Sequence, residues 1–301
     1  MRGSLLLILA AVPWCGTVAV AGDAQYARPE LLIEPTELAK PAVSKQFVIL
    51  DARSQAEYDQ GHVAGARRVD HDVWKKAFGE DRDAERWGKL IGNLGIGADA
   101  KVVVYDDKAM KDAARIWWIL RYWGIEDVRL LNGGWRGWKA SGLPTTAERP
   151  AAAARIQYAA TPRPERLATM AQVLDLLKDD KQQIVDARSE DEFCGLNKRD
   201  NERGGAIPGA KHLEWSDLID QQTQRFKSPD RLRRLFDQAG IDLDRPTISH
   251  CNGGGRASVM AFGLELMGAK DVRNYYRGWG EWGNAEDTPV VVPRKPGNKR
   301  P

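Results

Sequence analysis

The feature of this sequence that most constrains its fold is an internal repeat. The segment DARS at residues 51–54 recurs at residues 186–189, and a G-x-x-x-G-A pattern follows each copy. A short apolar run and a Gly-Trp pair then come in the same order in both halves, at 102–106 and 134–135, and at 247–251 and 278–279. From the end of the run to the tryptophan is 135 − 106 = 29 residues in the first copy and 279 − 251 = 28 in the second. This register predicts one structural unit used twice.

Each copy has the pattern of an α/β unit. The expected strands are short apolar runs bounded by turn or charged residues, as in strands buried on both faces, at residues 47–50, 102–105, 183–185 and 247–249. Helical patterns lie at residues 171–177, 229–239 and 257–267, the second opening with Ser228 as cap and Pro229 at the first helical position. The alternation predicts an α/β fold of two tandem domains, each a mainly parallel sheet with helices on both faces.

Two segments outside the repeats suggest the domain boundaries. Residues 1–21 contain one arginine, a short apolar run and, at the end, two small residues separated by one other residue. This pattern predicts a signal peptide and a periplasmic or secreted protein, with a retained membrane anchor as the alternative. A Pro- and Ala-rich stretch, 143–164, is expected to run over the surface of the first copy. The expected division is a signal peptide (1–21), a first domain (22–150), a linker (151–164) and a second domain with a basic tail (165–301). No other stretch is apolar enough to span a membrane.

Composition excludes several classes of function. The 45 basic and 42 acidic residues give a net charge of +3 and, outside the tail, the basic residues are scattered, so nothing favours a nucleic-acid partner. Three cysteines cannot form a disulfide framework in a chain of 301 residues. Loss of residues 1–21 would leave Cys194 and Cys251. No heptad or apolar stripe stands out, and a monomer is expected.

The segment 247–260, TISHCNGGGRASVM, carries the chemistry. An apolar run ends at Cys251, three glycines and Arg256 follow, and a helix begins. Glycines at such a turn let successive N–H groups point inward, and the helix N-terminus adds a partial positive charge. This is a cradle for an anion, and a cysteine at its floor is held as a thiolate. Cys251 is therefore predicted to be a nucleophile, with a small core cysteine as the alternative.

Other chemistries do not fit the spacing. A phosphate-binding P-loop needs GxxxxGK[ST], which is absent here. A papain-like cysteine needs a histidine base, and the chain has only His62, His71, His212 and His250. His250 adjoins Cys251 in the expected strand, so its side chain points to the opposite face and is expected to be packed there. No C-x-x-C or H-x-x-x-H spacing suggests zinc, so no metal is expected.

The doubled D-A-R-S and G-x-x-x-G-A blocks, with C-x-x-G-x-R in the second copy only, resemble the two-domain rhodaneses, which are thiosulfate and 3-mercaptopyruvate sulfurtransferases. The resemblance covers about residues 30–290. It implies that Cys251 takes up sulfane sulfur as a persulfide and that the substrate-binding loop is formed by Asn252, Gly253, Gly254, Gly255 and Arg256. Asp106 stands where the first copy would have the cysteine, which implies a catalytically silent first domain. It implies no cofactor, and as partners a small sulfur donor and a thiophilic acceptor such as cyanide or a thiol.

The resemblance also bears on the substrate. Rhodanese-like phosphatases have C-x5-R, whereas Cys251 and Arg256 are spaced C-x4-R, which favours sulfur over phosphate. Mercaptopyruvate enzymes tend to have C-G-S-G and an arginine after D-x-R, where this chain has Glu192. Thiosulfate is therefore the expected donor. The alternatives are 3-mercaptopyruvate, or a persulfide carrier or sensor with little turnover.

Several residues around this loop have two interpretations. Asp186, Arg188 and Glu192 are candidates to support it; because D-A-R occurs in both copies, a structural Asp186–Arg188 ion pair like Asp51–Arg53 is favoured over an anion contact. Lys108 and Lys111 either face the cleft between domains or are simply solvated. Cys194 is a spare thiol or a redox partner. The tryptophans, Trp117, Trp118 and Trp123 among them, are expected to fill the core and the interface.

Overall fold

The computed structural model describes residues 25–178 and 182–294, so the predicted signal peptide and most of the basic tail lie outside the described residues. Within these ranges the first half of the chain forms a five-stranded parallel sheet, in the order β1-β5-β4-β2-β3. Its strands are β1 (Leu32–Ile33), β2 (Phe47–Asp51), β3 (Arg67–Arg68), β4 (Lys101–Tyr105) and β5 (Val128–Leu131).

The second half repeats this topology. Its described strands are β6 (Gln183–Asp186), β7 (Lys211–His212), β8 (Thr247–His250) and β9 (Val272–Tyr275), in the order β7-β6-β8-β9 and all parallel. Read from the other edge, β9-β8-β6-β7 corresponds to β5-β4-β2-β3. An isolated parallel bridge between Leu167 and Asn274 lies where the first sheet has β1 against β5. The prediction of two tandem α/β domains with mainly parallel sheets is confirmed.

The four predicted strands are present, and each extends a residue further than expected. The strands β5 and β9 were not predicted, because Arg129 and Arg273 interrupt their apolar residues. Each arginine lies at its strand's second position and bonds an aspartate two residues before it, Asp127 or Asp271, at 2.8 and 3.3 Å. The charge is thus neutralised locally while the neighbouring strand residues stay buried.

Helices cover both faces of each sheet. In the first half they are η1 (Pro29–Leu31), α1 (Pro35–Leu38), α2 (Pro41–Ser44), α3 (Gln55–Gln60), α4 (His71–Glu80), α5 (Ala84–Gly92), α6 (Lys111–Tyr122) and α7 (Gly134–Ala140). In the second they are η2 (Pro164–Arg166), α8 (Met170–Leu176), α9 (Glu190–Phe193), η3 (Trp215–Leu218), α10 (Pro229–Gln238), α11 (Gly255–Leu266) and α12 (Gly278–Trp282). The predicted helices 171–177, 229–239 and 257–267 correspond to α8, α10 and α11, each within two residues.

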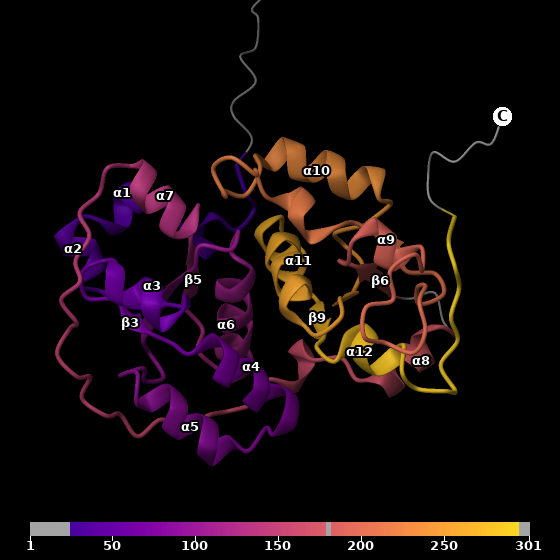
Figure 1. The fold of residues 1–301 in the computed structure, drawn as a ribbon, viewed down its shortest axis with the longest axis horizontal. Helices are drawn as coiled ribbons and strands as arrows, with labels where there is room; N and C mark the ends of the chain where they lie inside the picture. The colour runs from indigo at the N-terminus through magenta and orange to yellow at the C-terminus, as the bar shows by residue number, and fades with distance from the viewer. Residues whose placement is uncertain (1–24, 179–181, 295–301) are drawn as a thin grey trace, which may run out of the picture.

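The two halves meet along α6 and α11, which lie next to each other between the sheets (Figure 1). The contact is apolar and aromatic: the rings of Trp117 and Phe262 are 4.9 Å apart, and those of Trp118 and Tyr276 are 5.5 Å apart. One continuous core runs from the first sheet across this interface to the second. Trp117, Trp118 and Trp123 are fully buried, which confirms them as core and interface residues.

The stretch between the halves follows the surface of the first one, as predicted. Thr146 pairs with His62 in an antiparallel bridge, and the Ile156 N–H donates to the Gly92 carbonyl at 3.1 Å. The buried Tyr158 hydroxyl donates to the Trp123 carbonyl at 2.5 Å. These contacts attach the stretch to the loop after α3, to the end of α5 and to the end of α6. No helix in the described part of the chain has the length and apolar character needed to cross a membrane.

Candidate active site

Cys251 lies at the carboxyl end of β8, where the chain turns into α11, and is 2% exposed. Two backbone bonds from α12 hold this turn: Trp279 N–H to the Cys251 carbonyl at 2.7 Å, and Gly280 N–H to the Asn252 carbonyl at 2.9 Å. Gly278 has φ 50°, and a Cβ there would lie 2.1 Å from the Cys251 oxygen, so only glycine permits this approach. The turn is thus a fixed scaffold.

The corresponding turn of the first domain shows what the loop conformation can bind. Asp106 follows β4 as Cys251 follows β8, and its carbonyl accepts from Trp135 N–H at 2.7 Å, as Cys251 does from Trp279. The Asp106 carboxylate accepts four backbone N–H groups at 2.7–3.0 Å, from Lys108, Met110, Asp112 and Ala113. One loop of this fold therefore already holds an anion at the N-terminus of its helix.

In the second domain this helix end has no such partner. Gly254 is the N-cap residue of α11, with φ 81°, and no side chain of the described residues caps the helix. The first N–H groups of a helix have no partner within it. That of Gly255 donates to the Gly253 carbonyl at 3.1 Å, and those that follow it in the first turn are left to bind whatever anion forms at Cys251. A thiolate, a persulfide or an oxyanion fits this position, and the arrangement suits nucleophilic chemistry at sulfur.

A cavity of about 510 Å³ opens over Cys251, at the junction of the two domains. Its lining side chains include five cations and two carboxylates, so its charge favours an anionic ligand. The cations are Lys75, Lys111 and Arg115 from the first domain, and Arg199 and Arg256 from the second. The carboxylates are Glu192 and Glu214.

The cavity brings most of the predicted site residues together. Those that line it are Cys251, Asn252, Gly253, Gly255, Arg256 and Glu192. Gly254, Asp186 and Arg188 are not among the lining residues. Lys111 lines the cavity and Lys108 does not, although both pair with Asp112, at 3.6 and 3.5 Å. Lys75, Arg115 and Arg199 were not predicted; Arg115 had one sequence signal, a charge within the otherwise apolar run AARIWWIL.

Arg256 and Glu192 form an ion pair at the edge of the cavity. The guanidinium donates to both carboxylate oxygens at 2.5 and 2.9 Å, and the capping Ser189 and Arg199 contact the same carboxylate. Burial raises the pKa of Glu192, but the bonds and charge of Arg256 outweigh it and lower that pKa to about 2. The pair therefore stays charged, and Arg256 is fixed in place beside Cys251.

Asp186 and Arg188 form a second ion pair, which is fully buried behind the loop. The Arg188 guanidinium bonds Asp186 at 2.6 and 2.9 Å and the Gly205 carbonyl at 2.7 Å, and lies over the Trp279 ring. Arg53 makes the same contacts in the first domain, with Asp51, the Gly61 carbonyl and Trp135. Because a domain without the cysteine has the same pair, its geometry supports a structural role.

Comparison with known proteins identifies the family. The rhodanese-like domain matches twice, at residues 34–141 and 169–285. The chain belongs to the rhodanese-like family. Among curated relatives, the thiosulfate sulfurtransferase of Azotobacter vinelandii is 34% identical over 89% of this chain and 99% of its own. The sulfur carrier protein TtuD of Thermus thermophilus is 33% identical over 88% of this chain and 98% of its own.

Solved structures agree on the rhodanese-like fold. The anaerobic ergothioneine biosynthesis enzyme from Chlorobium limicola, in complex with trimethyl histidine, superposes with a TM-score of 0.80. It is 23% identical and covers 89% of this chain and 72% of its own. At this identity the likeness extends to the fold and not to the reaction.

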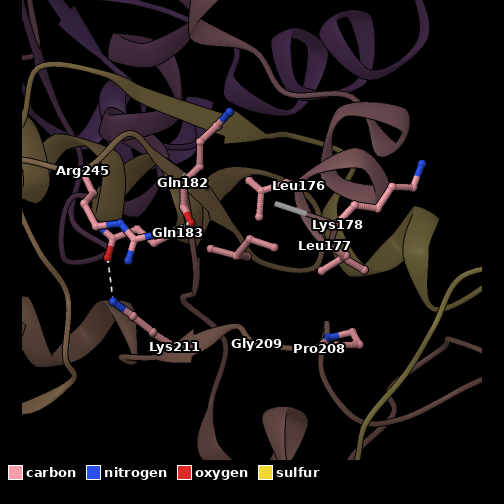
Figure 2. A pocket seen from close by; sticks show the side chains of 10 residues that line it. Leu176, Leu177, Lys178, Gln182, Gln183, Pro208, Gly209, Lys211 and Arg245 are labelled. Atoms are coloured by element: carbon pink, nitrogen blue, oxygen red, sulfur yellow. Dashed lines mark hydrogen bonds between the residues drawn. The ribbon is translucent and has the colours of Figure 1, made fainter. Parts of the chain in front are cut away.

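A second hollow in the second rhodanese-like domain, about 430 Å³, has a different character (Figure 2). Leu176, Leu177 and Pro208 give it an apolar side, and the Lys211 ammonium donates to the Gln183 side chain at 2.9 Å. None of its lining residues belongs to the Cys251 loop. Among residues 25–178 and 182–294, no group of three or more His, Cys, Asp or Glu side chains is placed to hold a metal ion.

His250 precedes the nucleophile candidate but points into the protein, as predicted. It is fully buried, its Nε2 lies 3.5 Å from Asp186, and neither ring nitrogen has a hydrogen bond within the described part of the chain. Tyr105 occupies the same register position in the first domain and donates to Asp51 at 2.6 Å. Burial lowers the pKa of His250 to about 4, although Asp186 opposes this shift.

This burial predicts that the contribution of His250 to stability falls as the pH drops below about 6.5. An unfolded histidine binds a proton near pH 6.5, whereas folded His250 does so only near pH 4, so the unfolded state gains the proton first. The loss should total on the order of 3 kcal/mol by pH 4. Urea unfolding from about pH 7.5 to about pH 4.5 measures it. Asp106, whose pKa burial raises to about 6, titrates in the same range with the opposite effect on stability, so the diagnostic quantity is the difference between the native protein and His250→Tyr, which copies Tyr105. The same dependence on pH in both proteins contradicts the assignment.

Proposed function

We propose that the protein is a thiosulfate sulfurtransferase that moves sulfane sulfur to a thiophilic acceptor through a persulfide on Cys251. The observation that carries the proposal is the position of Cys251 at the base of a cationic cavity and beside a helix N-terminus that no described side chain caps. Relatives named thiosulfate sulfurtransferase, including those of Azotobacter vinelandii and Corynebacterium glutamicum, support it at 34% and 33% identity over most of the chain.

In the first half-reaction the Cys251 thiolate attacks the outer sulfur of thiosulfate. A bond forms between Sγ and that sulfur, the S–S bond of thiosulfate breaks, and sulfite leaves with its electron pair. Charge is conserved, since the product is a persulfide anion. The backbone N–H groups of the loop and the fixed Arg256 are placed to balance the negative charge on donor, sulfite and persulfide.

In the second half-reaction an acceptor takes the outer sulfur. Cyanide or a thiolate attacks it, the persulfide S–S bond breaks, and Cys251 leaves as a thiolate, so the enzyme returns to its starting state. Because the donor product leaves before the acceptor reacts, the kinetics should be ping-pong. Apart from the donor and the acceptor, neither half-reaction needs a group that this chain does not supply.

The test is a comparison of donors. The protein is incubated under reducing pre-treatment with thiosulfate or 3-mercaptopyruvate and with cyanide as acceptor, and thiocyanate is measured with sulfite or pyruvate. The proposal expects turnover with thiosulfate, and a mass increase of one sulfur atom on the peptide that contains Cys251 when the acceptor is omitted. A clear preference for 3-mercaptopyruvate overturns the choice of donor.

A persulfide carrier is the second candidate. The similarity to TtuD, whose name describes a sulfur carrier protein, favours it. Both functions share the first half-reaction, so they differ only in the second. Stoichiometric persulfide with negligible multiple turnover on cyanide, glutathione and dithiols would identify a carrier, whereas sustained turnover identifies an enzyme.

The proposal includes export. It rests on the sequence of residues 1–21, which lie outside the described residues. Expression of the full chain in a bacterium with two membranes, followed by N-terminal sequencing of the periplasmic fraction, tests it. Cleavage after Ala21 supports export, and full-length protein in the cytosol contradicts it.

A further inference from the structure

Arg115 reaches from the first domain into the loop of the second. It lies on α6 and is 6% exposed. Its Nη1 donates to the Gly253 carbonyl at 2.7 Å and to the Tyr276 hydroxyl at 2.6 Å, and its guanidinium carbon lies 5.2 Å from the centre of the Tyr276 ring. Two parts of the second domain that are 23 residues apart, by 276 − 253, are thus bound to one side chain of the first.

The contact with Gly253 bears on the geometry of the anion cradle. The Gly253 carbonyl accepts from Arg115 and from Gly255 N–H at 3.1 Å. A trans peptide directs its C=O and N–H to opposite sides, so fixing this carbonyl also fixes the direction of the Gly254 N–H. Gly255 packs directly on the guanidinium, since a Cβ there would lie 2.4 Å from Nη2. Arg115 therefore determines where the loop backbone lies.

The charge of Arg115 is not neutralised by a carboxylate. Within residues 25–178 and 182–294, none lies within ion-pair distance of it, and its Nε is buried without a hydrogen-bond partner. Burial raises the pKa of Tyr276 although Arg115 opposes this, so the phenol stays neutral and accepts the bond. A buried guanidinium is costly unless an anion is near, and the cavity that it lines is the one that contains Cys251.

We propose that Arg115 is a positioning residue of the active site: it holds the Cys251 loop in its anion-binding shape and supplies a positive charge that the anion at Cys251 balances. The first domain, which lacks a nucleophile, is then a working part of the site. The inference rests on the proposed role of Cys251 and adds to it that sulfur transfer requires the two domains to be docked.

The test compares Arg115→Met and Arg115→Lys with the matched control Arg121→Met on the same helix, whose guanidinium bonds the Glu126 carbonyl. With thiosulfate and cyanide, Arg115→Met should lower kcat about 100-fold, because a displaced loop misplaces the nucleophile. Arg115→Lys keeps the charge but not the link to both Gly253 and Tyr276, so it should recover only part of kcat. Arg121→Met should stay within about threefold of the native protein.

A second readout does not depend on sulfur transfer. Cys251 is alkylated with anionic iodoacetate and with neutral iodoacetamide, and the ratio of the two rates is compared. Arg115→Met should lower that ratio about tenfold, since a positive charge near the thiolate is lost, and Arg115→Lys should restore it. A merely structural arginine would change both rates alike.

The outcomes separate this inference from the function. If folded Arg115→Met keeps both its kcat and its rate ratio, the inference is wrong. If the native protein transfers no sulfur, the proposed reaction fails, and the alkylation ratio still decides the role of Arg115. If Arg115→Met does not fold, Arg115→Lys and Tyr276→Phe, which removes one of the two acceptors, decide it: a native kcat in both variants overturns the proposal.

Discussion

Replacing Cys251 with serine is expected to lower turnover with thiosulfate and cyanide at least 1000-fold while leaving the fold intact. A serine hydroxyl stays protonated at this position and is a poor nucleophile towards sulfur. His250 is adjacent in sequence, but it is buried and points into the protein, so it cannot take the proton from the hydroxyl. The measurement is thiocyanate and sulfite release by the reduced protein, with the melting temperature recorded for both proteins.

The matched control is Cys194→Ser. Cys194 is buried at the C-cap of α9 and is not among the residues that line the cavity over Cys251, so the same change of sulfur to oxygen should cost some stability and little activity. Equal loss of activity in the two variants would point to a joint redox role for the cysteines. Residual turnover above a few per cent in Cys251→Ser would exclude a persulfide on that residue.

The fold class and the internal repeat could be predicted from the sequence, because each copy contains the same local signals. The capping boxes show this: Ser54 with Glu57 and Ser189 with Glu192 open α3 and α9 in the same way. The Cys251 loop could also be predicted, because its residues are contiguous in sequence and its glycines allow successive N–H groups to point inward. Gly278, which approaches Cys251 so closely, belonged to a repeated Gly-Trp pair whose function the sequence alone did not reveal.

Two cations of the first domain, Lys75 and Arg115, could not be predicted, because they reach the site only through the packing of α4 and α6 against the second domain. Lys111 had been singled out as a residue that could face the cleft. Arg115 is 138 residues from Gly253 in sequence, and no periodicity relates the two. Lys75 looked like any exposed helical lysine. The nucleophile and its loop belong to the second domain, but the cavity over them is lined by both domains. This sharing is visible only in the structure, where the two domains are docked.

The largest expected effect on stability is that of Arg188→Met, at about 3–5 kcal/mol. The substitution leaves Asp186, with no exposed surface, without its cation, and removes the bond to the Gly205 carbonyl. Chemical unfolding at neutral pH measures the loss. The double variant Asp186→Asn, Arg188→Met should be more stable than the single one, because no charge is then left buried and unpaired.

The stability that Arg188→Met loses relative to the native protein should decrease as the pH falls. Burial raises the pKa of Asp186, but the charges of His250 and Arg188 lower it to about 2 in the folded protein. The stability that this carboxylate contributes is therefore present above about pH 4 and is lost as the pH falls towards 2. Without Arg188 the folded carboxyl is protonated more easily, so the difference between the native protein and Arg188→Met should shrink in acid.

The corresponding variant Arg53→Met decides between structure and substrate binding. Arg53 makes the same contacts with Asp51, the Gly61 carbonyl and Trp135 in the domain that lacks the cysteine, so the two variants should lose similar stability. If Arg188 is structural, the folded Arg188→Met protein keeps the native KM for thiosulfate. A KM raised tenfold or more in Arg188→Met but not in Arg53→Met would instead make Arg188 a contact of the donor anion, since only the second domain would then use this pair in binding.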